Sequence, residues 1–334
     1  MDKRANPNFG GRNRTTEILD FISKWGTVLV IVFLIVFFSI KLPGIFLNSS
    51  NLINILRSIS TVTIIATGIT FSLAVGGFDL SVGSAATFAS TLVISMFVWY
   101  NKNVPFSIAV ALLIVLVVAV ANSLMIVKFK IFDMLSTLAA MFIFEGVALT
   151  YSGGGSISAG MPRLDGTPTI GKVPNAFKIL GQSPGIIIIM LVVVVLATIF
   201  LRYTKHGRYM YVVGGNREAA RLSGINVNKY KALAYFISTL LAGLGGLTLA
   251  ARNGSAQTNV GAAYLMPSVA AAYIGLSVAG AGKANPIGTL VGAVLVGILE
   301  NGLVMMSVPY YSLNIIKGLV LALALITTYA RKKD

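Results

Sequence analysis

The sequence of 334 residues has no cysteine and a single histidine, His206. Without cysteine the chain cannot form disulfide bonds, thiolate metal sites or a cysteine nucleophile. A lone histidine rules out a histidine cluster for a metal ion and leaves no credible Ser–His–acid set. The chain also has few acidic residues, 10 against 26 basic ones, and only 11% of its residues are charged. A soluble domain has roughly 25% charged residues, so this shortage indicates a membrane protein.

Long apolar runs dominate the sequence. Hydrophobic residues make up 56% of the chain, and the mean hydropathy is +0.86. A helix that spans a membrane needs about 20 apolar residues, and ten segments qualify. They predict an all-α polytopic membrane protein with one transmembrane domain over residues 25–330. The ten segments are 25–42, 52–75, 81–100, 105–127, 134–152, 185–203, 232–251, 264–281, 285–306 and 311–330.

The basic residues predict how these segments are oriented. Residues 1–24 are polar and lack the small-residue cleavage site of a secretory signal, so they are interpreted as a cytoplasmic tail. With the N-terminus inside, 18 of the 26 Lys and Arg residues lie in cytoplasmic segments, 7 lie outside and Lys317 lies within the last span. Because cytoplasmic loops are enriched in Lys and Arg, the C-terminal tail 331–334 is also expected inside. This topology accounts for the net charge of +16 without nucleic acid as a partner.

Two loops stand out on this topology. The extracytoplasmic loop, 153–184, is long and rich in Gly and Pro, so packing or a partner must order it. It is either a plain connector or a docking and gating surface for an external substrate-delivering protein. The longest cytoplasmic loop, 202–231, is either a basic loop whose charges hold the topology or a docking element for a partner protein.

The longest cytoplasmic loop contains the pattern of a short capped helix. Asn216 can cap its N-terminus, and Gly224 suits the left-handed residue that ends many helices. Such a helix has about two turns, too few for stability on its own. Ala219, Ala220 and Ser223 offer a small face that another surface can approach. The candidate docking residues are Gly214, Gly215, Asn216, Glu218, Ala219, Ala220, Arg221, Leu222, Ser223, Gly224 and Ile225.

Polar side chains inside the apolar runs are functional candidates, because a charge at membrane depth costs about 2.5–3.5 kcal/mol. Asp79 follows two glycines and precedes a helix, so it either caps the third span or lines a polar path. Glu145 lies in the fifth span without an assignable partner. Glu300, in the ninth span, either contacts a ligand or bonds to another helix, with Lys317 as a candidate ion-pair partner. The candidate path residues are Phe78, Asp79, Ser81, Glu145, Glu300 and Asn301.

Two further patterns concern packing and nucleotides. Small residues at Gly288, Gly292, Ala293 and Gly297 permit close helix contact, either within the subunit or across a dimer seam. The stretch 166–172 matches the start of a phosphate-binding loop. It lacks the Ser or Thr that should follow its lysine, and no strand-like run precedes it. No nucleotide site is therefore predicted in this chain.

Three stretches resemble one protein family. Residues 76–83, 207–225 and 279–302 are similar to segments of the ribose-type sugar permeases of bacterial ATP-binding cassette (ABC) importers, in the branch that also serves galactosides and autoinducer-2. Three separate matches in the right order make the resemblance specific for the family, though not for one sugar. The likeness runs from about Asn51 to the C-terminus. The family often has an amide where Glu300 stands, so the role of this position is an open question.

The resemblance implies a larger machine in the bacterial cytoplasmic membrane. Two such permease subunits form the pore, as a homodimer or with a similar partner. Two ATPase subunits bind ATP and Mg²⁺ on the cytoplasmic side, and an extracytoplasmic binding protein delivers a monosaccharide. This chain is then no enzyme and holds no cofactor itself. The residues 214–225 correspond to the element that couples the permease to its ATPase.

Other functions stay open from the residues alone. The family at large also includes permeases for nucleosides and for branched-chain amino acids. An ion-coupled secondary transporter could use Asp79, Glu145 and Glu300, and it would transport without any ATPase. An integral membrane enzyme is the third class, but it lacks a nucleophile–base pair or a metal set. The capped cytoplasmic helix favours the ABC permease, because an ion-coupled carrier needs no docking element there.

Overall fold

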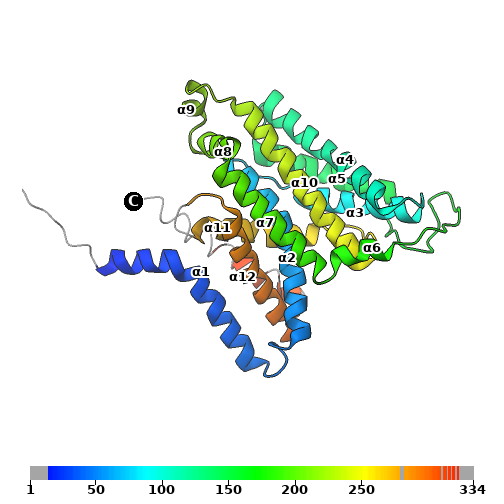
Figure 1. Ribbon diagram of the computed structural model, residues 1–334, viewed down its shortest axis with the longest axis horizontal. Helices are drawn as coiled ribbons and strands as arrows, with labels where there is room; N and C mark the ends of the chain where they lie inside the picture. Colours follow the sequence, from blue (N-terminus) through cyan, green and yellow to red (C-terminus); the bar gives the residue numbers. More distant parts are fainter. Residues whose placement is uncertain are drawn as a thin grey trace, which may run out of the picture.

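The computed structural model describes residues 14–278 and 282–309, together with 311–313, 315–316, 318–319 and 322. Over these residues the chain forms helices joined by turns, with one isolated antiparallel bridge between Ile157 and Ala256 (Figure 1). Some sequence predictions lie outside the described residues. They concern tail positions 1–13 and 331–334, most of the segment 311–330, and Lys317 within it.

Nine helices of the described chain coincide with the first nine predicted spans. They are α1 Arg14–Lys41, α2 Ser49–Ala74, α3 Val82–Val98, α4 Val104–Ser123, α5 Asp133–Ser152, α7 Gly185–Tyr203, α10 Val227–Asn253, α11 Ala262–Ser277 and α12 Pro286–Met305. Six are long and apolar enough to cross a membrane: α2, α4 with the following π-helix, α5, α7, α10 and α12. The all-helical fold class is therefore confirmed, while the count of ten spans stays a prediction.

Helix α1 begins earlier than the sequence analysis expected. The predicted tail ends at residue 24, whereas the helix already starts at Arg14. Between Arg14 and Trp25 the sequence has neither glycine nor proline, the two residues that most strongly oppose a helix interior. The helix therefore extends beyond its apolar part, Gly26–Lys41.

Helices α2 and α10 form the centre of the bundle, and α4, α5 and α7 lie at its periphery. The most apolar stretch of α2 is 67% buried and that of α10 is 61%, against 28% for both α4 and α5. The core side of α2 carries several buried hydroxyls, and some of them bond within the helix: Thr67 donates to the Thr63 carbonyl at 2.7 Å and Thr70 to the Ala66 carbonyl at 2.9 Å. The exposed apolar faces of the peripheral helices fit a lipid environment.

The small residues of α12 serve packing within the subunit. Gly288 lies against the carbonyl of Gly275, and Gly292 lies against the carbonyl of Ala271, both on α11. Gly297 lies against the side chain of Ile59 on α2. Of the two predicted uses of this spacing, contact within one subunit is the one that the structure has.

Helices α3 and α11 are short, and their N-terminal ends meet. The Gly83 and Gly261 backbones are in close contact, and the Gly261 amide donates to the Thr87 hydroxyl at 2.9 Å. Each helix is preceded by irregular chain: residues 75–81 before α3 and 254–261 before α11. Irregular backbone at membrane depth is tolerated where protein or water covers it.

The loops gather at two ends of α10 (Figure 1). At one end lie α8 (Lys205–Gly215) and α9 (Arg217–Leu222), which belong to the predicted cytoplasmic loop. At the other end lie α6 (Asn175–Lys178) and the 3₁₀ turn η2 (Ile179–Gly181), from the predicted extracytoplasmic loop. We refer to these as the α9 end and the α6 end. This separation agrees with the charge-based topology, which puts the two loops on opposite sides.

Candidate functional site

Helix α9 has the caps that the sequence predicts. The Asn216 side chain accepts hydrogen bonds from the Glu218 and Ala219 amides, both at 3.0 Å. At the other end Gly224 has a φ of +74°, and the Ile225 amide donates to the Ala220 carbonyl at 2.9 Å. These bonds satisfy backbone groups that a short helix otherwise leaves unpaired. The predicted two-turn helix is thus confirmed as a local structure.

The small face of α9 differs from the expectation. The sequence analysis placed Ala220 on a surface offered to a partner, but Ala220 is fully buried inside this chain, among the core residues around Met210, Val213 and Tyr230. Its small side chain lets α9 pack closely on α8 and α10. Ala219 and Ser223 are exposed as expected. A helix has only one face towards its own core, and the sequence did not reveal which residue would lie there.

The outward face of α9 is mixed in character. Leu222 has 81% of its surface exposed, which is unusual for a large apolar side chain on an ordered helix. Arg221 and Glu218 form an ion pair of 2.6 Å between side chains that are 73% and 63% exposed. Exposed pairs contribute about 0–1 kcal/mol, so these two side chains can exchange partners at little cost. This face combines an apolar anchor with adaptable charges.

The α8–α9 junction is in direct backbone contact with the turn that follows α2. A side chain at Gly214 would collide with the Ala74 carbonyl, and one at Gly76 would lie 3.1 Å from the Gly214 carbonyl oxygen. Gly76 also has a φ of +66°, which favours glycine. The Arg217 guanidinium donates to the Gly76 carbonyl at 3.3 Å. The two glycine-rich motifs of the sequence, far apart along the chain, thus form one site.

A buried ion pair lies beneath this contact. The Lys231 ammonium on α10 donates to Oδ1 of Asp133 at 2.6 Å, and the Tyr235 hydroxyl donates to Oδ2 at 2.8 Å. The two charged side chains are only 8% and 7% exposed. Arg217 on α9 approaches the same Oδ2 at 4.0 Å. Asp133 begins α5, where a carboxylate also suits the positive pole of the helix.

Sequence reasoning missed this ion pair. Lys231 was counted as one of the cytoplasmic charges that define the topology, and Asp133 was not singled out. A signal was available, since both residues stand immediately before a predicted apolar run and the topology puts both on the same side. Opposite charges in such positions are natural partners, because either one alone would be costly to bury.

Asp79 is fully buried, two residues after Gly77, and its side chain joins the start of α3 to α10. Its carboxylate accepts hydrogen bonds from the Ser81 amide at 2.9 Å, the Ser81 hydroxyl at 2.6 Å and the Ser238 hydroxyl at 2.7 Å. Asn122 on α4 donates to the Ser81 hydroxyl at 2.8 Å. The expectation that Asp79 caps α3 is wrong in detail, because Ser81 occupies the cap position and no side chain caps that helix. Asp79 instead closes a tight turn one residue earlier.

Phe78 and Asn301 have different surroundings. The Phe78 ring is half-buried, with its centroid 5.8 Å from that of Tyr273 on α11. Asn301 exchanges two hydrogen bonds, of 3.1 and 2.9 Å, with Asn51 at the start of α2. Asn301 therefore makes a helix–helix bond. Its neighbour Glu300 is half-buried, and the proposed partner Lys317 lies outside the described residues.

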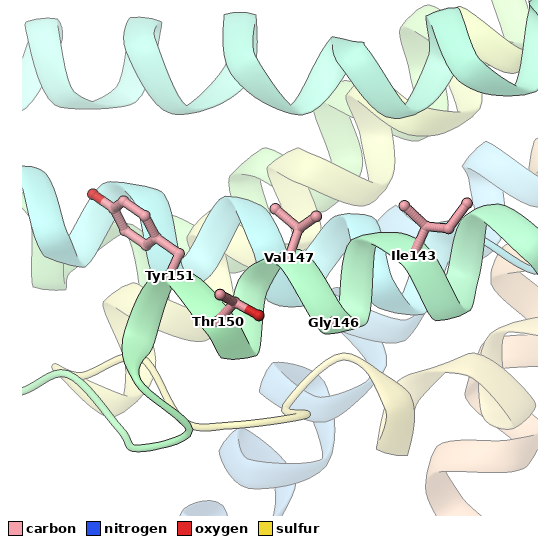
Figure 2. Close-up of a pocket in the computed structure, with 5 residues that line it drawn as sticks. All are labelled: Ile143, Gly146, Val147, Thr150 and Tyr151. Atoms are coloured by element: carbon pink, nitrogen blue, oxygen red, sulfur yellow. The ribbon is translucent and has the colours of Figure 1, made fainter.

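Helix α5 carries Glu145 and, on a different side, an open groove. The Glu145 side chain is half-buried and forms no hydrogen bond or ion pair within the described part of the chain. The groove is lined by Ile143, Gly146, Val147, Thr150 and Tyr151. Figure 2 shows Ile143, Val147 and Tyr151 projecting from the same side of the helix, with Gly146 leaving a gap. The six path candidates thus occupy separate places: the turn before α3, the middle of α5 and the end of α12.

The 153–184 loop is packed onto the α6 end. Arg163 donates to the Trp99 carbonyl, and its guanidinium lies 4.9 Å from the centre of the Tyr100 ring. Asp165 accepts two hydrogen bonds from Thr167, which hold the pKa of its carboxyl below the usual range. Ile170 is left 84% exposed. The loop is therefore ordered by contacts with the C-terminal end of α3, yet it keeps apolar surface outside.

Comparisons with known proteins support one family. Residues 51–326 match the family described as branched-chain amino acid transport system, permease component. The chain is 34% identical to the ribose import permease protein RbsC of Escherichia coli K12 over 306 residues, which cover 90% of this chain and 92% of that protein. It is 33% identical to the RbsC of Bacillus subtilis over 319 residues, 94% of each chain. The xylose transport system permease protein XylH of Haemophilus influenzae is 28% identical over 360 residues, 92% of this chain and 96% of that one. No solved structure gives a significant match.

Proposed function

Because the chain belongs to the permease-component family of bacterial ABC transport systems, we propose that it forms the membrane path of an importer for a simple sugar, ribose-like in size. The chain is a multi-pass protein of the cytoplasmic membrane and is not itself the ATPase. Membership implies an ATPase and a binding protein as partners. The resemblance derived from the three sequence stretches is confirmed at this level.

The sugar class rests on the named relatives. Those at 33–34% identity are ribose permeases, and those at 26–28% are xylose permeases. The family description names branched-chain amino acids instead, but a family description covers a wider group than its nearer members. We therefore favour a monosaccharide, with branched-chain amino acids and nucleosides as the alternatives.

The observation that carries the ATP-driven mechanism is the construction of α9. A two-turn helix, capped at Asn216 and held on α8 and α10 through buried Ala220, presents Leu222 outwards. A large apolar side chain that is left exposed gains free energy when a partner covers it. We assign the outward face of α9 to the docking of the ATPase, with residues 214–225 as the coupling element.

The topology belongs to the same proposal. Ten spans with both termini in the cytoplasm put the α9 end inside and the α6 end outside. The 18-to-7 split of basic residues supports this, and so does the separation of the two long loops to opposite ends of α10. The exposed apolar side chains of the 153–184 loop support its use as the docking surface for the binding protein rather than as a connector.

We assign the side of α5 that carries Glu145 to the transport path. Glu145 is half-buried in the middle of a span, and a carboxylate facing acyl chains costs about 2.5–3.5 kcal/mol. Water or a second permease subunit covers this face at lower cost. A homodimer, or a dimer with a similar chain, therefore encloses the path with α5 on its wall. The carboxylate accepts hydrogen bonds, which suits the hydroxyl groups of a sugar.

Reconstitution tests the function directly. The chain is placed in proteoliposomes with its ATPase and binding protein, and uptake of labelled ribose, xylose, leucine and uridine is compared. We expect sugar uptake that requires ATP and Mg²⁺ and continues in the presence of a protonophore and a sodium ionophore. Uptake by this chain alone, abolished by an ionophore, would instead show an ion-coupled carrier. Uptake of leucine or uridine in preference to sugars would overturn the substrate class.

A further inference from the structure

The glycine turn after α2 rests directly on the buried ion pair. A side chain added at Gly77 would lie 2.5 Å from the Tyr235 hydroxyl and 2.6 Å from Oδ2 of Asp133. The absence of a side chain therefore lets the turn backbone approach the carboxylate. A shift of Asp133 therefore displaces this backbone, because protein interiors are close-packed and leave little free space.

Helix α9 reaches the same carboxylate through Arg217. The Arg217 guanidinium, 52% exposed, lies 3.3 Å from the Gly76 carbonyl oxygen and 4.0 Å from Oδ2 of Asp133. A half-exposed contact at 4.0 Å is cheap to lengthen or shorten. The Lys231–Asp133 contact, at 2.6 Å and almost without solvent, is costly to lengthen. The site thus joins one adjustable charge on α9 to one fixed charge on α10.

The fixed part of the site continues to Asp79. Lys231, Tyr235 and Ser238 stand four and three residues apart on α10, so they lie along one face of that helix. Lys231 and Tyr235 hold Asp133, and Ser238 holds Asp79.

Helix α5 holds the same turn from another side. Asp133 lies under Gly77, and one helical turn later the Thr137 hydroxyl accepts from the Leu80 amide at 3.2 Å. The turn before α3 is therefore held between α5 and α10, and the Asp133–Lys231 pair joins these two helices directly.

On the basis of the function proposed above, we infer that Asp133 is a positioning residue for transport. Through Arg217, it makes the position of the turn before α3 depend on the position of α9. Movement of α9 with its ATPase changes the distance from Arg217 to Asp133 and to Gly76. Because Lys231 fixes Asp133 to α10, the change is passed on to the turn and to α5 rather than absorbed by a free side chain. The pair therefore links ATP hydrolysis to opening of the path.

The test separates this role from mere stabilisation. Asp133→Asn alone leaves Lys231 as a buried unpaired charge, so it lowers the amount of folded protein as well. The double variant Asp133→Asn/Lys231→Met removes both charges, and replacing a buried pair with neutral side chains is often neutral for stability. Lys229→Met, an exposed lysine on the same helix, is the matched control. Each variant is reconstituted with the ATPase and binding protein, and the ATP hydrolysed per sugar imported is measured.

We expect the double variant to insert and to retain the ATPase on purification, with the ATP used per sugar raised on the order of tenfold, within the usual range of coupling between sites. Lys229→Met keeps the wild-type ratio. A wild-type ratio in the double variant would overturn the inference and leave the pair a structural element. If the double variant fails to insert, Arg217→Gln decides by the same ratio, and a wild-type value there overturns the inference. Failure of the wild-type complex to transport with ATP would count against the proposed function instead.

Discussion

The two ends of the molecule are built differently. At the α9 end, glycine backbones touch, and a buried ion pair and a buried carboxylate tie the α2–α3 turn to α4, α5, α9 and α10. At the α6 end, the polar side-chain ties are the neutral amide pair Asn51–Asn301 and the Arg163 contacts of the long loop, beside a close backbone contact of Gly181 with Arg252. The buried ion pair resists relative movement, because separating it leaves two buried charges without partners. Neutral and partly exposed side-chain contacts can be exchanged for water at lower cost. The α9 end is therefore suited to transmit force, and the α6 end to receive a partner.

The largest effect is expected from Ala220→Glu. This position is completely buried at the α9 end, and an ionised side chain without a partner there costs several kcal/mol. We expect little folded protein in the membrane, rather than a normally inserted protein that has lost its ATPase. Ala219→Glu is the matched control, since its position is exposed on the same helix. Equal membrane levels of the two variants would contradict the packing described for α9.

Leu222→Glu is expected to separate docking from folding. The side chain is 81% exposed, so the variant should insert at wild-type levels. Loss of an interface anchor costs about 2 kcal/mol or more, so the ATPase should no longer co-purify. Leu222→Met, which keeps an apolar side chain, should retain it. Wild-type recovery of the ATPase with Leu222→Glu would show that this face of α9 carries no contact.

Asp79→Ala should reduce transport more than Glu145→Ala. The alanine leaves the Ser81 amide and the Ser81 and Ser238 hydroxyls without their buried acceptor, at about 1–3 kcal/mol for an unsatisfied group. Glu145→Ala removes one wall contact of the path and breaks no bond within the described chain. Uptake is compared at equal amounts of reconstituted protein. Equal uptake by Asp79→Ala and wild type would make Asp79 a dispensable part of the turn.

The smallest effect is expected at the α6 end. Asn301→Ala removes two exchanged hydrogen bonds with Asn51 at a half-buried position, worth about 1 kcal/mol each. The melting temperature of the purified complex should fall slightly, while the ATP used per sugar should not change. The double variant with Asn51→Ala should cost less than the sum of the single variants. A large change in the ATP-to-sugar ratio would contradict the claim that the α9 end, and not the α6 end, couples ATP hydrolysis to transport.

The parts of this structure that local chemistry determines could be predicted from the sequence. The caps of α9 follow from Asn216 and Gly224, whose neighbours along the chain complete the bonds. The order of nine helices follows from apolar runs. The inward face of Ala220 and the Asp133–Lys231 pair could not be read, because each depends on which distant segment lies opposite. The short lengths of α3 and α11 were equally hidden, since apolar residues continue past the helix ends.

The central claim is that the α9 end faces the ATPase in the cytoplasm. The natural absence of cysteine permits a clean test with single cysteines at exposed positions: Leu222→Cys on α9 and Ser156→Cys in the 153–184 loop. In intact cells, a membrane-impermeant thiol reagent should label Ser156→Cys and leave Leu222→Cys unlabelled. In the purified complex, a short thiol–amine cross-linker should join Leu222→Cys, and not Ser156→Cys, to the ATPase. Labelling of Leu222→Cys from outside, or its failure to cross-link while the ATPase remains bound, would contradict the account.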